Sequence, residues 1–492
     1  MRTSISHPLQ IAEVTIAEDY GKLGITFCPG KVQSFGQTGA WHRDLELDLD
    51  AVAAWNAAVV LTLVEERELI LLQVPRLGDA VRARHIDWVH LPIADRGVPD
   101  AAFERAWDEV GEGLRARLRA GFNVLVHCMG GLGRAGTIAS RLLIELGWEP
   151  QAAVAEVRRV RPGAIETDGQ MEAVYGYEVV QEQAPDLSDQ AVRDRAIGAL
   201  VGLAVGDAVG TTLEFQARDS YPPLTDMVGG GPFALAAGQW TDDTSMALAL
   251  ADSLIAFDGF DERDLMTRFL SWYEDGAYSS TGRCFDVGVT TRQALGRFKS
   301  TGDPVAGSTD PMSAGNGSLM RLAPVAIRYW QDQAVLRDAV ARQSRTTHAA
   351  PEAVDACVAF AGRLADAIAG KPRSEVLGTR IVDLAPKIAE IEAGSWRGKQ
   401  RDDVRSSGYV VHSLEAAMWC VARTASFKDA VLLAANLGDD ADTVAAITGQ
   451  LAGAFYGWSA VPRNWLGRLA MQGRIIGMAD ELFSSASRSG QA

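Results

Sequence analysis

The pattern of hydrophobic and polar positions changes character once along the chain. In roughly the first 180 residues, short apolar runs alternate with amphipathic stretches. Apolar runs bounded by turn residues predict strands, and apolar positions spaced three or four apart predict helices. Alternating strands and helices indicate a mostly parallel sheet with helices on both faces, an α/β fold. The strands are predicted at 23–30, 58–64, 85–93 and 123–127, and the clearest helices at 103–119 and 135–147.

Helical periodicity dominates from about residue 191 onward. Stretches such as GALVGLAVGDAVG, MALALADSLIAF and VAAITGQLAGAF are rich in alanine and glycine, which suits close packing between helices. We find no convincing set of strands there and predict an all-α domain. A short polar stretch with one proline, QEQAPDLSDQ, separates the two patterns and indicates a linker. The predicted domains are therefore 1–183 and 192–492, joined by a linker at 184–191.

Composition narrows the range of partners and compartments. The chain has 492 residues, too many for one ordinary core, with 47% hydrophobic and 22% charged residues. A net charge of −16 disfavours nucleic acid and anionic membranes as partners. The five cysteines form no CxxC pair, which is typical of a reducing compartment. The N-terminal sequence has no apolar signal-peptide core, so we expect a cytoplasmic protein that binds neither membrane nor nucleic acid.

Two acid-rich sequences each stand directly before an apolar helical run. NLGDDADT carries Asp439, Asp440 and Asp442, and QWTDDTSM carries Asp242 and Asp243. One or two acids at a helix start are explained by capping and by the helix dipole, but three in four positions repel one another. Each sequence alone fits a helix cap; together they favour one shared cation site. Carboxylate and hydroxyl ligands suit Mg²⁺, Mn²⁺ or Ca²⁺ better than zinc.

These residues carry a family resemblance. From about residue 192 to 458 the chain resembles the ADP-ribosylhydrolases, in particular the bacterial branch that includes the glycohydrolase which reactivates dinitrogenase reductase. Seven motifs support the resemblance, and they follow one another along the whole segment. In chain order they are GLAVGDAVGTTLEF, QWTDDTSM, GRCFDVGVTTRQAL, GNGSLMRLAPVAI, SRTTHA, SSGYVVHSLEAAMW and NLGDDADT.

The resemblance implies an all-α ADP-ribosylhydrolase fold and a site for two Mg²⁺ ions, with Mn²⁺ as an alternative. Asp439 falls where the family tolerates other residues and is left out of the site. The ligands carried over from the family are Thr241, Asp242, Asp243, Asp440, Asp442 and Thr443.

The resemblance also implies an ADP-ribose site and two candidate catalytic acids. Subfamilies differ over which acid does the work, so both Glu214 and Asp286 are retained. Ala314 stands where some relatives carry a stacking aromatic residue, so other residues would have to pack against ribose or adenine. The residues expected to lie against ADP-ribose are Ser313, Gly315, Asn316 and His348.

A second chemical motif, HCMGGLGRAG, follows the predicted strand 123–127 and opens a predicted helix. Gly130, Gly131 and Gly133 let main-chain N–H groups turn inward, where they form an anion site at a helix N-terminus. Arg134 can grip two phosphate oxygens, and the same positive field favours the thiolate of Cys128, a nucleophile. The alternative is a buried cysteine at a strand end followed by a glycine-rich turn.

Residues 23–177 resemble the cysteine phosphatases of the dual-specificity and tyrosine type, within which they look most like the cyclin-dependent-kinase-associated phosphatase. The matching stretches are HCMGGLGR, LPIADRGVPD and VRRVRPGAIETDGQ. By this match Asp95 is the general acid, and Gln170 either positions the attacking water or is a surface residue. Ala135 stands where the family usually has Ser or Thr, whose hydroxyl helps the thiolate leave. Turnover is therefore expected to be slow.

These observations lead to the hypothesis of a bifunctional hydrolase. One site would release ADP-ribose from a modified protein or an ADP-ribose derivative, with arginine the expected linkage and serine or a free derivative still open. The other would hydrolyse a phosphomonoester. Two alternatives remain: the N-terminal domain is a slow or inactive phosphate-binding module, or both sites act in sequence on one substrate that carries phosphate and ADP-ribose.

Overall fold

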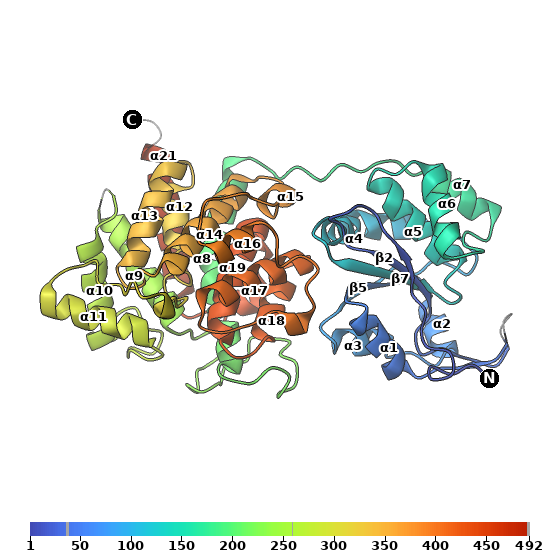
Figure 1. Cartoon of the computed structure of the whole chain (residues 1–492), viewed down its shortest axis with the longest axis horizontal. Helices are drawn as coiled ribbons and strands as arrows, with labels where there is room; N and C mark the ends of the chain where they lie inside the picture. Colours follow the sequence, from blue (N-terminus) through green and yellow to red (C-terminus); the bar gives the residue numbers. More distant parts are fainter. Residues whose placement is uncertain (36–38, 258, 490–492) are drawn as a thin grey trace. The chain divides into compact units, whose positions relative to one another are not determined.

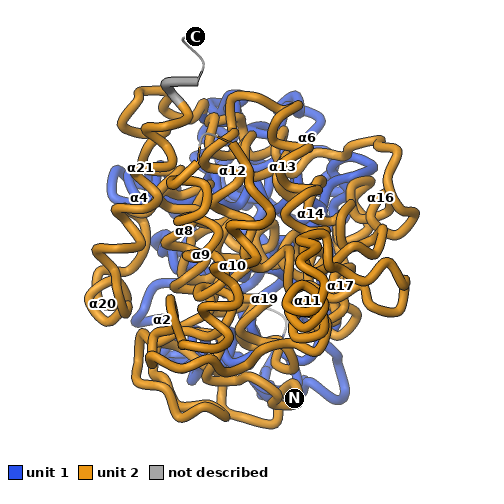
Figure 2. The backbone as a smooth tube through the Cα atoms, turned by 90° about the vertical axis from the view of Figure 1, so that its left-hand side faces the viewer, with its two compact units in different colours: residues 1–183 blue, residues 184–492 orange. Residues whose placement is uncertain are grey.

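The chain forms two compact units, Met1–Gln183 and Ala184–Ala492 (Figures 1 and 2). The computed structural model describes residues 1–35, 39–257 and 259–489. All strands longer than an isolated bridge in these ranges belong to the first unit, and the second is built from helices. The predicted fold classes, α/β followed by all-α, are confirmed.

The first unit contains a five-stranded sheet of order β1-β2-β7-β5-β6, in which only β1 runs antiparallel to its neighbour. The central strands β5 and β7 are apolar and almost fully buried, as expected where helices cover both faces. Their carboxyl ends meet at one edge, where Thr62 pairs with His127 and Phe27 with Cys128. The strands are β1 Ala12–Val14, β2 Leu23–Phe27, β5 Ala57–Thr62, β6 Asp87–His90 and β7 Asn123–Cys128, beside a small hairpin of β3 Val32–Gln33 and β4 Trp41–His42.

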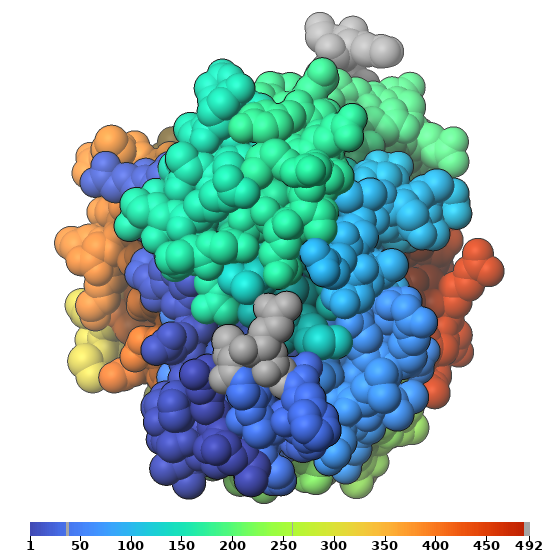
Figure 3. Space-filling view, turned by 90° about the vertical axis from the view of Figure 1, so that its right-hand side faces the viewer, coloured from blue at the N-terminus to red at the C-terminus, as the bar shows by residue number. Residues whose placement is uncertain are grey.

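Helices lie on both faces of this sheet. As drawn in Figure 1, α4 and α5 lie above it and α1 and α3 below it. Helices α6 and α7 cover the upper part of the face shown in Figure 3, in teal and green. Short α2 and α3 were not predicted, because six-residue helices leave no clear periodicity. The bounds are α1 Leu45–Ala54, α2 Glu66–Leu71, α3 Leu77–Arg82, α4 Ala101–Arg119, α5 Gly133–Glu145, α6 Pro150–Val160 and α7 Asp168–Tyr175.

The second unit is organised around α8 (Asp189–Gly210) and α19 (Ala441–Tyr456), which lie at its centre in Figure 1. Helix α8 begins at Asp189, inside the segment predicted as a linker, with Ser188 as its N-cap. It is long and apolar enough to span a membrane by composition, yet 94% of its most apolar window is buried inside the unit. It is therefore a core helix.

Glycines allow α8 and α19 to touch backbone to backbone. A Cβ atom placed on Gly202 would lie 2.1 Å from the carbonyl oxygen of Gly449, and one on Gly206 would lie 2.1 Å from that of Ala445. No side chain fits in that space. The same clash would arise at Gly198 and Gly210, so the contact repeats every fourth residue along α8.

The remaining helices of the second unit surround this pair. They are α9 Asp242–Ala256, α10 Glu262–Asp275, α11 Val289–Thr301, α12 Ala323–Tyr329, α13 Gln333–Arg345, α14 Pro351–Ala369, α15 Arg373–Val376, α16 Pro386–Glu392, α17 Val410–Arg423, α18 Phe427–Ala435, α20 Arg463–Leu466 and α21 Gln472–Ser489. Short 3-10 turns add η1 Thr211–Leu213, η2 Pro311–Ser313, η3 Arg401–Asp403 and η4 Trp458–Ala460.

Adding one methyl group at this contact should separate the two helices. We expect Gly202→Ala to lower the free energy of unfolding of the second unit by about 3 kcal/mol, because the new Cβ meets rigid backbone. Urea unfolding of the full chain measures this. Gly296→Ala on the exposed face of α11, where a Cβ would meet no atom within 4 Å, should instead raise stability by about 0.5–1 kcal/mol. Equal effects of both variants would contradict the close contact.

Candidate functional sites

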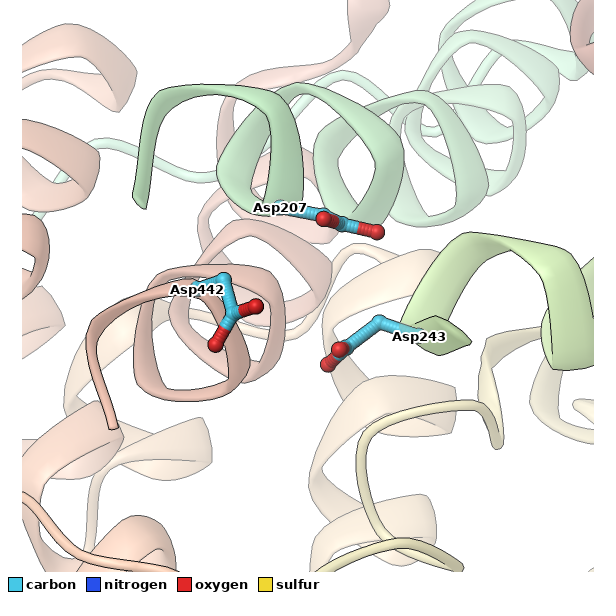
Figure 4. Close-up of side chains that lie close together, drawn as sticks. All are labelled: Asp207, Asp243 and Asp442. Carbon is cyan, nitrogen blue, oxygen red and sulfur yellow. The ribbon is translucent and has the colours of Figure 1, made fainter. Parts of the chain in front are cut away.

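Three carboxylates from three different helices meet beside the glycine contact. Asp207 comes from α8, Asp243 from the first turn of α9 and Asp442 from the first turn of α19. Figure 4 shows their side chains turned toward one another, with one oxygen of each within 4.8 Å of the others. The two acid-rich helix starts predicted to share one site are thus brought together, although α9 begins at Asp242 and α19 at Ala441.

A second group of carboxylates shares Asp442. Glu214, Asp440 and Asp442 also offer oxygens within 4.8 Å of one another. The Glu214 carboxylate accepts hydrogen bonds from the main-chain N–H groups of Ala441 (2.8 Å) and Asp442 (3.3 Å). It therefore caps the start of α19, where the helix dipole favours negative charge. Two groups of three oxygen donors that share one carboxylate suit a pair of hard divalent cations.

Hydroxyl groups complete the acid cluster. The Thr241 hydroxyl lies 2.9 Å from an oxygen of Asp207 and 3.2 Å from oxygens of Asp243 and Asp442. Asp207 also accepts bonds from Thr244, through its N–H at 3.0 Å and its hydroxyl at 2.6 Å. The Oδ1 atom of Asp243 is buried without a hydrogen-bond partner among the described residues. A buried carboxylate oxygen without a hydrogen-bond partner is available to coordinate a cation.

Burial and mutual repulsion raise the pKa values of these acids. Burial, then repulsion from Asp442, raises the pKa of Asp207 and of Asp440 to about 7. Burial and the charges of Asp242 and Asp442 raise the pKa of Asp286 to about 11. The pKa values of Asp242, Asp243 and Glu214 are raised too, with burial the largest cause. Divalent cations would offset this repulsion, and the donor set fits them.

The acids open onto a cavity of about 920 Å³. Asn316 connects its walls, because its side-chain amide donates to Asp440 at 2.7 Å and to the Ser413 hydroxyl at 2.8 Å. The N-terminal residues of α11 also face the cavity. Of the predicted site residues, those that line it are Glu214, Asp242, Asp286, Gly315, Asn316, His348, Asp440, Asp442 and Thr443.

Other predicted residues lie elsewhere. Thr241 and Asp243 are fully buried within the acid cluster and do not line the cavity. Ser313 does not line it either; its hydroxyl donates to the carbonyl oxygen of Asp310 at 2.6 Å and stabilises η2.

His348, which does line the cavity, is held by the Thr347 hydroxyl, 2.8 Å from its Nδ1, and burial lowers its pKa to about 3. It is therefore a neutral ring.

Sequence reasoning missed Asp207 and left Asp439 out of the metal site. Asp207 was overlooked because it stands alone in the middle of an apolar helix, GLAVGDAVG, far from either acid-rich stretch. An isolated acid inside a buried helix is itself a usable signal, because such a charge must find partners or a cation. Asp439 was set aside, yet it lines the cavity.

The second site lies where β7 ends. Cys128 is the last residue of β7, and the N–H of Gly131 donates to its sulfur at 3.2 Å. Gly131 has φ +67, and a Cβ there would lie 2.4 Å from the carbonyl oxygen of Thr26, so only glycine fits. Helix α5 begins two residues later, at Gly133. The strand, loop and helix place the thiol of Cys128 at a helix N-terminus, as the sequence predicts.

Arg134 is held beside this loop by three partners. Its guanidinium donates to both oxygens of Glu68 (2.6 and 2.9 Å), to the carbonyl oxygen of Ile93 (2.9 Å) and to Asp95 (3.1 Å). The Arg134 guanidinium is thereby fixed in one orientation. Asp95 belongs to a different loop and its side chain is 59% exposed, so it remains accessible to a substrate. Cys128, Arg134 and Asp95 are thus gathered at one place.

Cations outside the loop hold its carbonyl groups. Arg161 donates to the carbonyl oxygens of Gly131 (2.9 Å) and Gly130 (3.0 Å), and Lys31 donates to that of Met129 (3.0 Å). Carbonyl oxygens held in this way leave the N–H groups of the loop to an anion. Sequence reasoning missed Glu68, Lys31 and Arg161, because each lies far from the motif.

Gln170 closes the other side of the loop. It is fully buried, so the alternative of a surface residue is wrong. Its side-chain oxygen accepts from the N–H of Glu166 at 2.9 Å, and its amide nitrogen donates to the carbonyl oxygen of Gly97 at 3.1 Å. The Glu166 carboxylate in turn accepts from the N–H of Gly133 at 2.9 Å. Gln170 therefore ties α7 to the loop that follows Asp95.

Comparisons with known proteins agree with both resemblances. Residues 188–492 match the family model described as ADP-ribosylglycohydrolase, and residues 41–174 match that of the Swiss Army Knife protein, DSP-PTPase phosphatase domain. The chain is 49% identical over 294 residues to ADP-ribosylarginine hydrolase Tri1 of Serratia proteamaculans, covering 60% of this chain and 80% of that protein. It is 34% identical to the ADP-ribosyl-[dinitrogen reductase] glycohydrolase of Rhodospirillum rubrum over 290 residues, 58% of this chain and 94% of that one.

One solved structure extends the comparison to the fold. The structure of an ADP-ribosylglycohydrolase-related protein complex is 41% identical, with a TM-score of 0.54, and covers 60% of this chain and 99% of that one. The all-α architecture of the second unit is therefore shared with a solved structure.

The raised pKa values predict how stability depends on pH. A carboxyl whose pKa is higher in the folded than in the unfolded protein makes the folded state bind more protons, so stability falls as pH rises above about 4. We expect Asp243→Asn, in chelator-treated protein, to raise the free energy of unfolding of the second unit by at least about 1 kcal/mol at pH 8 and to leave it unchanged at pH 4. Calorimetry measures the difference.

The matched control is Asp275→Asn at the exposed end of α10, which should change stability little at either pH. If Asp243→Asn has the same effect at pH 4 and pH 8, the buried carboxylate carries no charge cost and the pKa assignment is wrong.

Proposed function

Because the chain belongs to the ADP-ribosylglycohydrolase family, we propose that its second unit is a Mg²⁺-dependent hydrolase that releases ADP-ribose from modified arginine side chains. The observation that supports this most directly is the meeting of acids from α8, α9 and α19 beside one cavity, which Asp242 and Asp442 of this cluster line. A sugar hydroxyl pair and a scissile anomeric bond need such a clustered set of oxygen ligands and acids.

The residues proposed to hold two Mg²⁺ ions, or Mn²⁺, are the clustered acids. Asp207, Asp243 and Asp442 form one set, and Glu214 and Asp440 join Asp442 in the other. When bound, the cations orient the ribose hydroxyls and stabilise charge at the anomeric centre. The protein's own part is to bind the sugar, to exclude bulk water and to move protons.

Proton transfer falls to the acids that line the cavity. Hydrolysis breaks the bond between the anomeric carbon and the side-chain nitrogen, and water adds to that carbon. The departing nitrogen takes up a proton, and the attacking water loses one. Asp286 lines the cavity outside both sets of proposed ligands, and burial, the largest cause of its raised pKa, lets it hold a proton near neutral pH. We propose that Asp286 supplies the proton to the leaving group, while Glu214 acts as a carboxylate beside the cations.

The arginine linkage is supported by a relative named as an ADP-ribosylarginine hydrolase, 49% identical over 294 residues. Serine-linked ADP-ribose and free nucleotide derivatives are the competing substrates. Purified protein should therefore be assayed, with and without Mg²⁺, on all three classes. Release from arginine that requires Mg²⁺ supports the proposal, and preference for another class contradicts the linkage.

For the first unit we propose phosphomonoester hydrolysis. The supporting observation is the gathering of Cys128, Arg134 and Asp95 around one anion-binding loop. The Cys128 thiolate would attack phosphorus while Asp95 protonates the departing oxygen. Water would then break the phosphorus–sulfur bond, releasing phosphate and restoring the thiolate. Arg134 and the N–H groups of the loop would bind the charged phosphoryl oxygens.

A second function, a phosphate-binding module that recruits the hydrolase to phosphorylated targets, is favoured by one observation. Ala135 is fully buried beside Arg134 and offers no hydroxyl to assist the departing thiolate. Loss of that assistance slows the second chemical step but leaves phosphate binding intact.

Two substitutions should separate the two proposed activities. We expect Cys128→Ser to abolish release of phosphate and to leave release of ADP-ribose from arginine within about twofold of the wild-type rate. Asp442→Ala should do the reverse, lowering ADP-ribose release by at least about 100-fold. Both activities are measured on the full chain. Comparable losses in both assays from either variant would contradict two independent sites.

Restoring the missing hydroxyl tests the role of position 135. We expect Ala135→Ser to raise the turnover of para-nitrophenyl phosphate up to about tenfold, because it assists release of the thiolate. Wild-type protein should show a burst of nitrophenol as phosphocysteine accumulates. If neither protein turns over the ester while a phosphopeptide binds tightly, the first unit is a binding module.

A further inference from the structure

An exposed aromatic side chain stands at the cavity of the second unit. Phe215 lines the cavity with 67% of its surface exposed, and its ring meets the edge of Phe233 at 6.3 Å between centroids. Phe233 in turn packs against Phe285 at 5.2 Å. This aromatic strip, defined by the three rings, joins the segments that carry Glu214 and Asp286. A large apolar side chain left open beside a polar site indicates a ligand surface.

The backbone at Phe215 is held in a conformation that phenylalanine rarely adopts. Its φ is +61, and Asp439 across the cavity wall has φ +54. The N–H of Phe215 donates to the carbonyl oxygen of Asp439, and the N–H of Asp439 donates to that of Gln216, both at 2.7 Å. These two bonds fix the strained residues next to each other. Strain that is maintained in this way is concentrated at functional positions.

Asp439 presents an uncommitted charge at the cavity. Its side chain is exposed and makes no hydrogen bond or ion pair within the described part of the chain. Arg218 interacts electrostatically with Asp439. Its guanidinium, however, donates hydrogen bonds to the main-chain carbonyl groups of Leu437, Arg401 and Val404. The Asp439 carboxylate is thus free to bind a cation from outside.

We infer that Phe215 and Asp439 form the subsite for the guanidinium of the modified arginine, an inference that rests on the proposed hydrolase function. Each adjoins an acid of the cluster in sequence: Phe215 follows Glu214, and Asp439 precedes Asp440. The leaving group must lie beside the ribose held by those acids. A planar cation stacks on an aromatic face and pairs with a carboxylate, whereas a serine hydroxyl gains from neither.

The rest of ADP-ribose fits a different part of the cavity. Its diphosphate would be repelled by Asp439. Among the described residues that line the cavity, Arg292 is the one lysine or arginine, and it lies in the first turn of α11. A helix N-terminus with an arginine suits a diphosphate. The adenine is separated from the reacting ribose by that diphosphate and a second ribose, so we expect it beyond the diphosphate and not beside the leaving group.

The test compares a substrate that has the guanidinium with a product that lacks it. Phe215→Leu keeps an apolar side chain but removes the aromatic face, and Asp439→Asn keeps a residue that tolerates positive φ but removes the charge. We expect each to raise KM for ADP-ribosylarginine about tenfold. The value of kcat and the inhibition constant of ADP-ribose should each stay within about twofold. Both variants are made in the full chain, with folding checked by circular dichroism.

Phe257→Leu and Asp383→Asn are matched controls, because both side chains are exposed and neither lines the cavity. Unchanged KM in the two subsite variants overturns the inference, as does a parallel rise in the inhibition constant of ADP-ribose, which would place the residues on the nucleotide side. Wild-type protein that releases nothing from arginine contradicts the proposed function itself, and the subsite with it.

Discussion

The backbone contact between α8 and α19 is the constraint on which the second unit depends. Glycines at every fourth position of α8 bring the two helix axes as close as main-chain atoms allow. Asp207 and Asp442 stand on these helices next to Gly206 and Ala441, so the helix spacing also sets the spacing of their carboxylates. A bulkier residue in the contact would pull the acids apart as well as weaken the core.

The acid cluster shows how binding chemistry is gained at the expense of stability. Asp207, Asp242, Asp243 and Asp442 are all buried, and their charges repel one another. A core of this kind is more stable when protonated or when cations are bound. The first unit reduces such repulsion by pairing buried arginine side chains with carboxylates. Its buried Arg134 faces Glu68, and the buried Arg43 faces Asp48, so each charge has its counterpart within the protein.

Sequence patterns predicted the parts of each site that lie close together in the chain. The strand, glycine loop and arginine of HCMGGLGRAG occupy ten consecutive residues, and their chemistry is local. The meeting of the two acid-rich helix starts was also predictable, because each alone fits a helix cap but the two together favour one shared cation site. Glu68, Lys31 and Arg161 were not, because only the fold brings them to the sites, and the one sequence signal of Asp207 is its isolation within an apolar helix. Ser313 stays a prediction from the motif match, and in the structure its hydroxyl donates to the carbonyl oxygen of Asp310.

The order of helices along the chain has a consequence during synthesis. Helix α8 leaves the ribosome at the start of the second unit, while α19 follows well over two hundred residues later. Throughout that interval the nascent chain carries an apolar segment, comparable in length and hydropathy to a membrane span, without the partner that buries it. The contact between α8 and α19 can form only late in synthesis, because the two helices are separated by most of the sequence of the second unit. Contacts between residues far apart in sequence form slowly. Until this contact forms, the exposed apolar helix makes the emerging polypeptide prone to aggregation.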